Sequence, residues 1–237
     1  MNNGAIILTG GSSRRMGGET DDKVLLTLGG QPLFLYSLNV FLQSGLCQEI
    51  VIVHRDEEQK EQLQSHLPKD SSVCFTFTLG GKERMNSVHN GLSAFTSTPE
   101  IVFIHDAARP FIFVELLQKL LQATQSHGAA CPASRITDTL KRTSSEKPSA
   151  LTSVDRENLW AMQTPQTFVY SEILHAYQEA IESGVQLTDD TSALERKGRK
   201  VYILVNPSPN PKLTTPTDLP MMEFLLTRAC PNRLNPL

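Results

Sequence analysis

Apolar residues along this chain occur in two recurring patterns. Short, continuous apolar clusters predict strands, and segments with an apolar residue every three or four positions predict helices. The expected strands are 5–8, 50–53, 73–79, 101–104 and 201–205, and the expected helices are 33–44, 57–66, 86–95, 114–125, 172–182, 190–197 and 216–227. Clusters that are apolar at consecutive positions are typical of strands buried on both faces. Their alternation with helices predicts an α/β fold: a Rossmann-like, mostly parallel twisted sheet with helices on both faces.

The alternating pattern is interrupted between about 135 and 168. This segment is polar, rich in Ser and Thr, and has little periodicity, which would suit a linker, an insertion or a protruding arm. It contains Trp160, and disordered segments are usually poor in aromatic residues. We therefore expect an ordered arm used for contacts, within a single domain that spans 1–237. Thr188 is the expected N-cap of the helix that follows, and the tail from about 228 to 237 is expected to be frayed.

The charge balance narrows the possible ligands. The chain has 22 basic and 25 acidic residues, which gives a net charge of -3. Proteins that bind nucleic acids need many Lys and Arg side chains to neutralise phosphates, so we expect no nucleic-acid partner. Any binding of phosphate must therefore rest on a few well-placed cations.

The termini and the cysteines suggest a cytoplasmic protein. The N-terminus lacks the basic segment of a secretory signal, and no apolar stretch is long enough to span a membrane, so we expect no membrane partner. The cysteines are far apart and form no pair typical of a disulfide framework or a zinc site. We expect buried or incidental thiols in a reducing compartment at Cys47, Cys74, Cys131 and Cys230.

The segment after the first expected strand has the strongest chemical signal. It runs Gly-Gly-Ser-Ser-Arg-Arg-Met-Gly-Gly from Gly10, and Lys23 follows it. Glycine lets backbone N–H groups approach a ligand closely, and Arg and Lys side chains bind phosphate oxygens. The spacing fits neither a Walker A loop nor a dinucleotide-binding fingerprint. The segment is either a polyphosphate-binding loop or a surface loop with solvated charges.

Three later segments place polar residues where a strand ends or a helix begins. They start at Gly80, His105 and Asn210. Ligands of open α/β sheets bind at the carboxyl ends of the strands, so we expect polar groups to gather there. Asp106 and Arg109 combine a carboxylate suited to Mg²⁺ with a cation suited to phosphate. An isolated Asp at such a place would more often cap a loop than bind a metal.

In their order along the chain, these segments resemble the 2-C-methyl-D-erythritol 4-phosphate cytidylyltransferases. The similarity runs from about 5 to about 226, and its most specific parts are the Asp-Ala-Ala-Arg-Pro and Thr-Pro-Gln segments. The matching motifs are Gly10-Gly11-x-x-x-Arg15-Met16-Gly17, Lys23, Gly80-Gly81-x-x-Arg84-x-x-Ser87-Val88, Asp106-Ala107-Ala108-Arg109-Pro110, Asp138-Thr139-Leu140-Lys141, Asp155-Arg156, Gln163-Thr164-Pro165-Gln166 and Asn210-x-Lys212-x-Thr214.

The resemblance implies a reaction for non-mevalonate isoprenoid synthesis. The phosphate of methylerythritol phosphate attacks the α-phosphorus of CTP, and pyrophosphate leaves without a covalent enzyme intermediate. The resemblance also implies Mg²⁺ as a cofactor, with Asp106 as its ligand. Two alternatives stay open: a cytidylyltransferase that uses ribitol 5-phosphate as the acceptor, and a nucleotide-binding module without catalytic activity.

The same resemblance assigns residues to the nucleotide. Arg15 and Lys23 correspond to groups that stabilise the transition state. The loop around Gly10 and Gly11 would hold the triphosphate, and other positions would hold the base and the ribose. The expected nucleotide-binding residues are Gly10, Gly11, Ser12, Gly81, Lys82, Ser87 and Asp106. The family commonly has an acidic residue at position 82, so the Lys82 contact with the base would use its backbone.

The remaining matched residues belong to the acceptor. Arg156 and Lys212 would align the acceptor phosphate for in-line attack. Because both reactants are anionic, cations must offset their repulsion. The full acceptor set is Arg109, Thr139, Arg156, Thr164 and Lys212. In this family the arm reaches into the neighbouring subunit, so the resemblance implies a homodimer with exchanged arms and shared sites.

Overall fold

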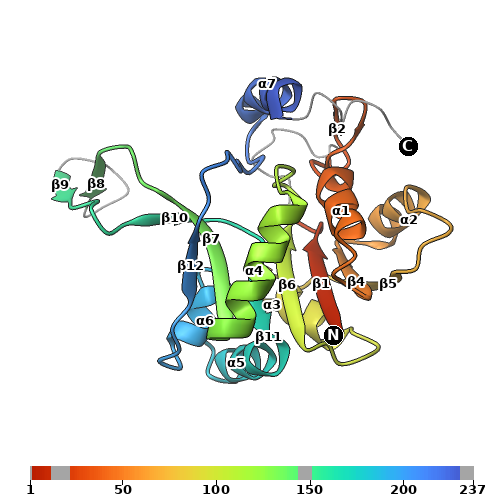
Figure 1. Cartoon of the computed structure of the whole chain (residues 1–237), viewed down its shortest axis with the longest axis horizontal. Coiled ribbons are helices and arrows are strands. Elements are labelled where there is room, and N and C mark those ends of the chain that lie inside the picture. Colours follow the sequence, from red (N-terminus) through yellow and green to blue (C-terminus); the bar gives the residue numbers. More distant parts are fainter. Residues whose placement is uncertain (1, 12–21, 144–150, 230–237) are drawn as a thin grey trace.

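A central sheet forms the middle layer of the structure (Figure 1), a computed structural model that describes residues 2–11, 22–143 and 151–229. Within these ranges, eight strands pair in the order β10-β7-β11-β6-β1-β4-β5, and β12 pairs with β7. These strands are β1 (Asn3–Leu8), β4 (Glu49–His54), β5 (Cys74–Leu79), β6 (Ile101–Asp106), β7 (Ala129–Arg135), β10 (Trp160–Met162), β11 (Gln166–Val169) and β12 (Tyr202–Val205).

Helices cover both faces of this sheet. One face packs against α1 (Leu33–Ser44), α2 (Glu57–Ser65) and α4 (Val114–His127). The opposite face packs against α3 (Arg84–Ser93), α5 (Tyr170–Glu182) and α6 (Thr191–Glu195). Outside these layers lie a short β2–β3 hairpin (Thr27–Leu28 and Gln31–Pro32), the 3₁₀ turn Pro216–Asp218, α7 (Leu219–Ala229), and the strands β8 and β9 described below. The expected α/β fold, with a mostly parallel sheet between helices, is confirmed.

The continuous apolar runs reflect this two-sided burial. Successive side chains of a strand point to opposite faces of the sheet. In β1, Ile6 packs into the core beneath α3 and α5, whereas Ala5 and Ile7 pack into the core beneath α1 and α4. Because both faces are covered, the central positions of these strands are apolar, and their buried polar residues, such as Glu49 and Asp106, lie at strand ends.

The parallel register brings several strand ends to one edge of the sheet. Leu8 of β1 pairs with Val53 of β4 and with Asp106 of β6. On the far side of β4, His54 pairs with Leu79 at the end of β5. The loops that follow these strands therefore begin side by side, which is where ligands of α/β proteins bind.

The segment between 135 and 168 is ordered in its described part, and it contributes to two sheets. Strands β8 (Leu140–Thr143) and β9 (Leu151–Val154) pair with each other and extend away from the central sheet, as Figure 1 shows. Strands β10 and β11 instead pair with β7 and β6 in the central sheet. The part that protrudes is thus shorter than 135–168, because the end of the segment, from Trp160 on, pairs with β7 and β6 in the central sheet.

Several boundaries differ from the sequence-based expectation. Strand β7 was not anticipated, because its Ala, Cys and Pro residues give a weak strand signal. The prediction of Thr188 as an N-cap is wrong: α6 begins at Thr191, and Asp189 Oδ1 accepts the N–H of Ser192 at 3.1 Å. The last expected helix is divided into the 3₁₀ turn and α7. Helix α7 extends through 228 and 229, and the rest of the expected tail lies outside the described residues.

Of the helices in the described ranges, none has the length and apolar composition that crossing a membrane requires.

Candidate active site

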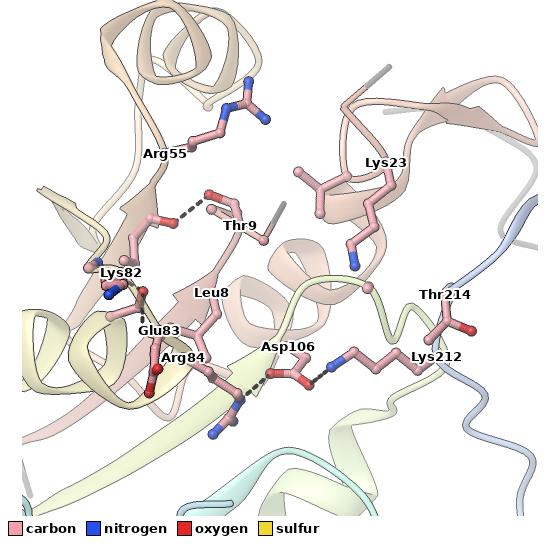
Figure 2. A pocket seen from close by; sticks show the side chains of 17 residues that line it. Leu8, Thr9, Lys23, Arg55, Lys82, Glu83, Arg84, Asp106, Lys212 and Thr214 are labelled. Atoms are coloured by element: carbon pink, nitrogen blue, oxygen red, sulfur yellow. Dashed lines mark hydrogen bonds and ion pairs between the residues drawn. The ribbon is translucent and has the colours of Figure 1, made fainter. Parts of the chain in front are cut away.

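An open cavity of about 530 Å³ lies over the carboxyl ends of β1, β4, β5 and β6. Its walls come from the loops that follow these strands, from the chain around Lys23, and from the segment between Lys212 and Thr214. Figure 2 shows these parts facing one another across the cavity. Of the residues predicted for the nucleotide, Gly10, Gly11, Gly81, Lys82, Ser87 and Asp106 line it.

The backbone after β1 is held at the cavity by hydrogen bonds to β4. The N–H groups of Thr9 and Gly10 both donate to the carbonyl of Val53, each at 3.0 Å. A Cβ atom on Gly10 would lie 3.1 Å from the His54 carbonyl carbon, so glycine permits this close approach of two backbones. The residues predicted next in the same loop, Ser12 and Arg15, lie outside the described residues.

The chain returns to the cavity at Asp22 and Lys23. Gln59 is buried, and its Nε2 donates both to the Thr9 carbonyl at 3.1 Å and to the Asp22 carboxylate. Arg55 forms a further ion pair with Asp22 at 3.2 Å. These contacts hold Asp22 beside the end of β1, and Figure 2 shows the next residue, Lys23, with its amine directed into the cavity.

The loop after β5 turns tightly into α3. The N–H of Gly81 donates to Ser87 Oγ at 3.0 Å, and Ser87 Oγ donates to the Glu83 carbonyl at 3.2 Å. A Cβ atom on Gly81 would lie 2.2 Å from the Cβ of Asn86, so any larger residue at position 81 would force the loop to move. Glu83 and Asn86 form a capping box that starts α3 at Arg84.

Asp106 is a buried carboxylate on the wall of the cavity, and two cations hold it. Arg84 Nε donates to Oδ1 at 3.2 Å, and Lys212 Nζ donates to Oδ2 at 2.5 Å, from opposite sides (Figure 2). Burial alone would raise the pKa of Asp106, but Arg84 and Lys212 outweigh it and hold this pKa below its ordinary value of 3.8. Asp106 is therefore ionised at neutral pH.

Two residues predicted for the acceptor, Thr164 and Arg109, lie behind the residues that line the cavity. Thr164 Oγ1 accepts the N–H of Asp106 at 3.1 Å and contacts His105 Nδ1 at 3.1 Å. Arg109 Nη1 donates to the Asn210 carbonyl at 2.7 Å, and Asn210 Nδ2 donates to the Thr164 carbonyl at 3.0 Å. This network joins the end of β6 to the segment that carries Lys212.

His105 is fully buried within this network. The Arg109 carbonyl can only accept, so His105 Nε2–H donates to it at 3.1 Å. In the neutral imidazole Nδ1 then carries no hydrogen and accepts the Thr164 hydroxyl at 3.1 Å, while that hydroxyl oxygen accepts the N–H of Asp106. Burial lowers the pKa of His105 to about 3, with the cations Arg109 and Lys212 contributing in the same direction.

Thr139 and Arg156 lie apart from the other predicted residues. Thr139 precedes β8 and Arg156 follows β9, both are exposed, and the Arg156 guanidinium donates to the Thr137 carbonyl. Neither residue is among those that line the cavity within the described parts of the chain. One copy of this chain therefore does not bring them to Asp106.

Sequence reasoning missed a second buried carboxylate close to the site. Arg84 Nη1 and Nη2 donate to the two carboxylate oxygens of Asp190 at 2.7 and 2.8 Å. Arg84 belongs to a recognised motif, whereas Asp190 belongs to none and is only the first residue of the expected helix 190–197. No local pattern links the two residues, because they are 106 positions apart.

The described residues contain no group of three His, Cys, Asp or Glu side chains that could hold a metal ion by itself. Mg²⁺ at nucleotide sites is usually held by one or two carboxylates together with substrate phosphates. The ionised carboxylate of Asp106, which lines a cavity with polar walls, fits that arrangement.

The fold and the site together define an α/β nucleotidyltransferase: a cavity at the carboxyl ends of parallel strands, glycine-containing loops, and a carboxylate held by Arg84 and Lys212. The sequence profile of the 2-C-methyl-D-erythritol 4-phosphate cytidylyltransferases matches residues 4–228. The chain belongs to this family, which confirms the resemblance seen in the motifs.

Individual relatives agree with this assignment. A 2-C-methyl-D-erythritol 4-phosphate cytidylyltransferase of Geobacillus kaustophilus is 42% identical over 228 residues, which cover 95% of this chain and 97% of the relative. Its counterpart in Symbiobacterium thermophilum is 40% identical and covers 93% of this chain and 91% of its own length. The crystal structure of 4-diphosphocytidyl-2C-methyl-D-erythritol synthase from Anaerococcus prevotii superposes with a TM-score of 0.82 at 26% identity, covering 96% of this chain and 99% of its own.

Proposed function

We propose that this protein transfers the cytidylyl group of CTP to the phosphate of 2-C-methyl-D-erythritol 4-phosphate. An oxygen of the acceptor phosphate forms a bond with the α-phosphorus of CTP. The bond from that phosphorus to the bridging oxygen of the β-phosphate breaks, and pyrophosphate leaves with the bonding electrons. The observation that carries this proposal is the gathering of Lys23, Asp106 and Lys212 around one cavity in a chain of this family.

In this reaction the protein mainly positions the reactants and stabilises charge. The loops at Gly10 and Gly81 would hold CTP through backbone groups, with Lys82 and Ser87 beside the nucleoside. Lys23, and with it Arg15, would offset the charge that develops on the α-phosphate and on departing pyrophosphate. The direction of Lys23 into the cavity supports this role.

Mg²⁺ would be held by Asp106 together with oxygens of the triphosphate. When bound, the ion would neutralise phosphate charge and orient the triphosphate for in-line displacement. Support comes from the low pKa of Asp106, which keeps the carboxylate charged, and from its position on the cavity wall. Asp106 Oδ2 already pairs with the ammonium group of Lys212, which supports the idea that this oxygen can also bind a metal cation.

The acceptor would be bound by Lys212, Arg109 and Thr164 of one subunit and by the arm of another. Thr139 and Arg156 are exposed beside a hairpin that extends away from the central sheet, which supports a homodimer with exchanged arms. Arg156 of the partner subunit would then share the acceptor phosphate with Lys212. Cys47, Cys74 and Cys131 carry no disulfide, which supports a location in the reducing cytoplasm.

A direct assay of the purified protein tests the function. Pyrophosphate release and the cytidylylated product are measured with CTP, Mg²⁺ and either methylerythritol phosphate or ribitol 5-phosphate. We expect a higher kcat/KM with methylerythritol phosphate. Faster turnover of ribitol 5-phosphate would assign the alternative acceptor. CTP binding without pyrophosphate release from either acceptor would instead indicate a nucleotide-binding module without catalytic activity.

A further inference from the structure

Arg84 connects the cavity carboxylate to a second carboxylate that lies behind it. Its Nε donates to Asp106 Oδ1 at 3.2 Å, while Nη1 and Nη2 form a two-pronged contact with Asp190 at 2.7 and 2.8 Å. A guanidinium can make these three contacts at once because its donors are fixed in one plane. The orientation of the Asp106 carboxylate therefore depends on where Asp190 holds Arg84.

Asp190 is a rigidly held anchor for the guanidinium of Arg84. Its side chain is fully buried, and the hydroxyl of Tyr177 on α5 donates to its Oδ1 at 2.5 Å. The next residue, Thr191, donates its backbone N–H to Gln166 Oε1 on β11 at 3.1 Å. Asp190 is thus tied to a helix and to a strand, neither of which belongs to the cavity wall.

Lys212 contacts Asp106 in a different way. It reaches Oδ2 with a single amine at the end of a flexible four-carbon chain, and within residues 2–11, 22–143 and 151–229 no second carboxylate pairs with that amine. A single ammonium contact of this kind is more easily exchanged than a guanidinium held by three hydrogen bonds. Of the two cations on Asp106, Arg84 is the fixed one and Lys212 is the one that can leave.

We propose that Arg84, anchored by Asp190, is a positioning residue that fixes Asp106 through Oδ1 and leaves Oδ2 able to exchange Lys212 for a divalent cation. This inference rests on the proposed function. It adds that Lys212 is released toward the acceptor phosphate when Asp106 takes up the cation. Arg84 remains in place and offsets part of the charge of Asp106 throughout.

Substitution of Arg84 by Lys tests the proposal, because it keeps the charge and removes the two-pronged contact with Asp190. Mn²⁺ serves as the probe, and its Kd in the presence of CTP is measured by electron paramagnetic resonance. Because partners that orient metal ligands typically contribute about 10- to 100-fold to metal affinity, we expect the Mn²⁺ Kd of R84K to rise by about that factor. CTP binding without metal should stay close to that of the wild type.

A second variant, Asp190→Asn, keeps the shape of the anchor and removes its charge. It should raise the Mn²⁺ Kd in the same direction as R84K and lower kcat more than it changes the KM for CTP. Asp106→Asn should remove the contribution of this carboxylate to Mn²⁺ binding altogether. If D190N does not fold, the comparison of R84K with D106N decides the question.

Tyr170→Phe is the matched control for loss of stability. Tyr170 is a buried tyrosine of the same helix α5, and its hydroxyl donates to the Leu92 carbonyl at 2.8 Å without contacting Arg84 or Asp190 in the described structure. We expect Y170F to lower Tm and to leave the Mn²⁺ Kd unchanged.

A wild-type Mn²⁺ Kd in R84K and D190N, or an equal rise in Y170F, would overturn the inference, as would a D106N variant that binds Mn²⁺ normally. Failure of the wild type to release pyrophosphate, with the expected Mn²⁺ pattern intact, would reject the proposed function alone.

Discussion

Lys212 Nζ lies 2.5 Å from Asp106 Oδ2, although the two residues are 106 positions apart in the sequence. Two backbone contacts explain the meeting. The N–H of Leu213 donates to the Ala108 carbonyl at 2.9 Å, and Arg109 donates to the Asn210 carbonyl at 2.7 Å. These contacts hold the segment before α7 against the loop after β6. The amine of Lys212 therefore lies beside the carboxylate of Asp106.

Replacement of Lys212 by Met should impair use of the acceptor. The methionine keeps the apolar stem and removes the charge that would align the acceptor phosphate, while Arg84 still holds Asp106. We expect kcat/KM for methylerythritol phosphate to fall about 100-fold or more at saturating CTP. The Kd of CTP, measured by calorimetry, should change much less. A parallel loss of CTP affinity would contradict this role and assign Lys212 to the triphosphate.

Replacement of Lys23 by Ala should lower turnover far more than CTP affinity. The proposed contact of its amine strengthens as charge develops in the transition state, so kcat should fall about 100-fold or more. Steady-state kinetics and CTP titration separate the two effects. Lys60→Ala is a suitable control, because Lys60 pairs with the exposed Glu57 on the same helix, α2, outside the cavity lining. If CTP affinity collapses while kcat holds, the proposed role of Lys23 is wrong.

Replacement of Arg156 by Ala should weaken acceptor binding and leave CTP binding near normal. If the arm works in the neighbouring subunit, mixing R156A with K23A restores one complete site in each hybrid dimer. That site combines Lys23 of one subunit with Arg156 of the partner subunit. The measurement is pyrophosphate release by hybrid dimers isolated with two different affinity tags. Hybrids that are no more active than their parents would argue against a shared site.

His105 should make the protein sensitive to mild acid. Its pKa is lowered from 6.5 to about 3 in the folded state, so between these values the unfolded chain binds more protons than the folded protein does. The contribution of His105 to the free energy of unfolding is therefore fully present above pH 6.5, and it is lost as the pH decreases toward about 3. The slope from this one group approaches about 1.4 kcal/mol per pH unit.

Urea unfolding at pH 7 and pH 5 measures this contribution. The His105→Asn variant should lose less stability between the two pH values than the wild type does. His175→Asn is the control, because His175 is an exposed residue of α5 that pairs only with Glu179 in the described structure. Equal losses in the wild type and H105N would show that His105 does not become protonated on unfolding in this range.

Much of the fold could be predicted because its signals are local. The helix over 33–44 and the apolar runs around 50–53 and 101–104 reappear as α1, β4 and β6. Strands β7 and β10 could not be predicted in this way. Strand β7 contains Ala, Cys and Pro residues of weak strand propensity, and β10 is only three residues long. They are strands because Trp160 pairs with Arg135 and Met162 with Ala133 across a long separation in sequence.

The same distinction between local and long-range signals applies to the residues of the candidate site. Motifs singled out Asp106, Lys212 and the glycines around Gly81, because each lies in a short segment with distinctive residue types. The motifs contain Arg84 without indicating what it contacts, and Asp190 belongs to none of them. Their ion pair arises from the packing of α3 against α5 and α6, a relationship between helix faces that has no local signature in the chain.

The sequence by itself determined most of the helices, the apolar strands of the parallel part of the sheet and the family, and it indicated a small set of candidate cations for phosphate. Local propensity, hydrophobic periodicity and motif spacing act over a few residues, so they can be read directly. The tertiary structure alone decided that Asp106 lies between Arg84 and Lys212, and that Thr139 and Arg156 lie away from the cavity. Those outcomes depend on sheet register and helix packing, through which residues more than a hundred positions apart come into contact.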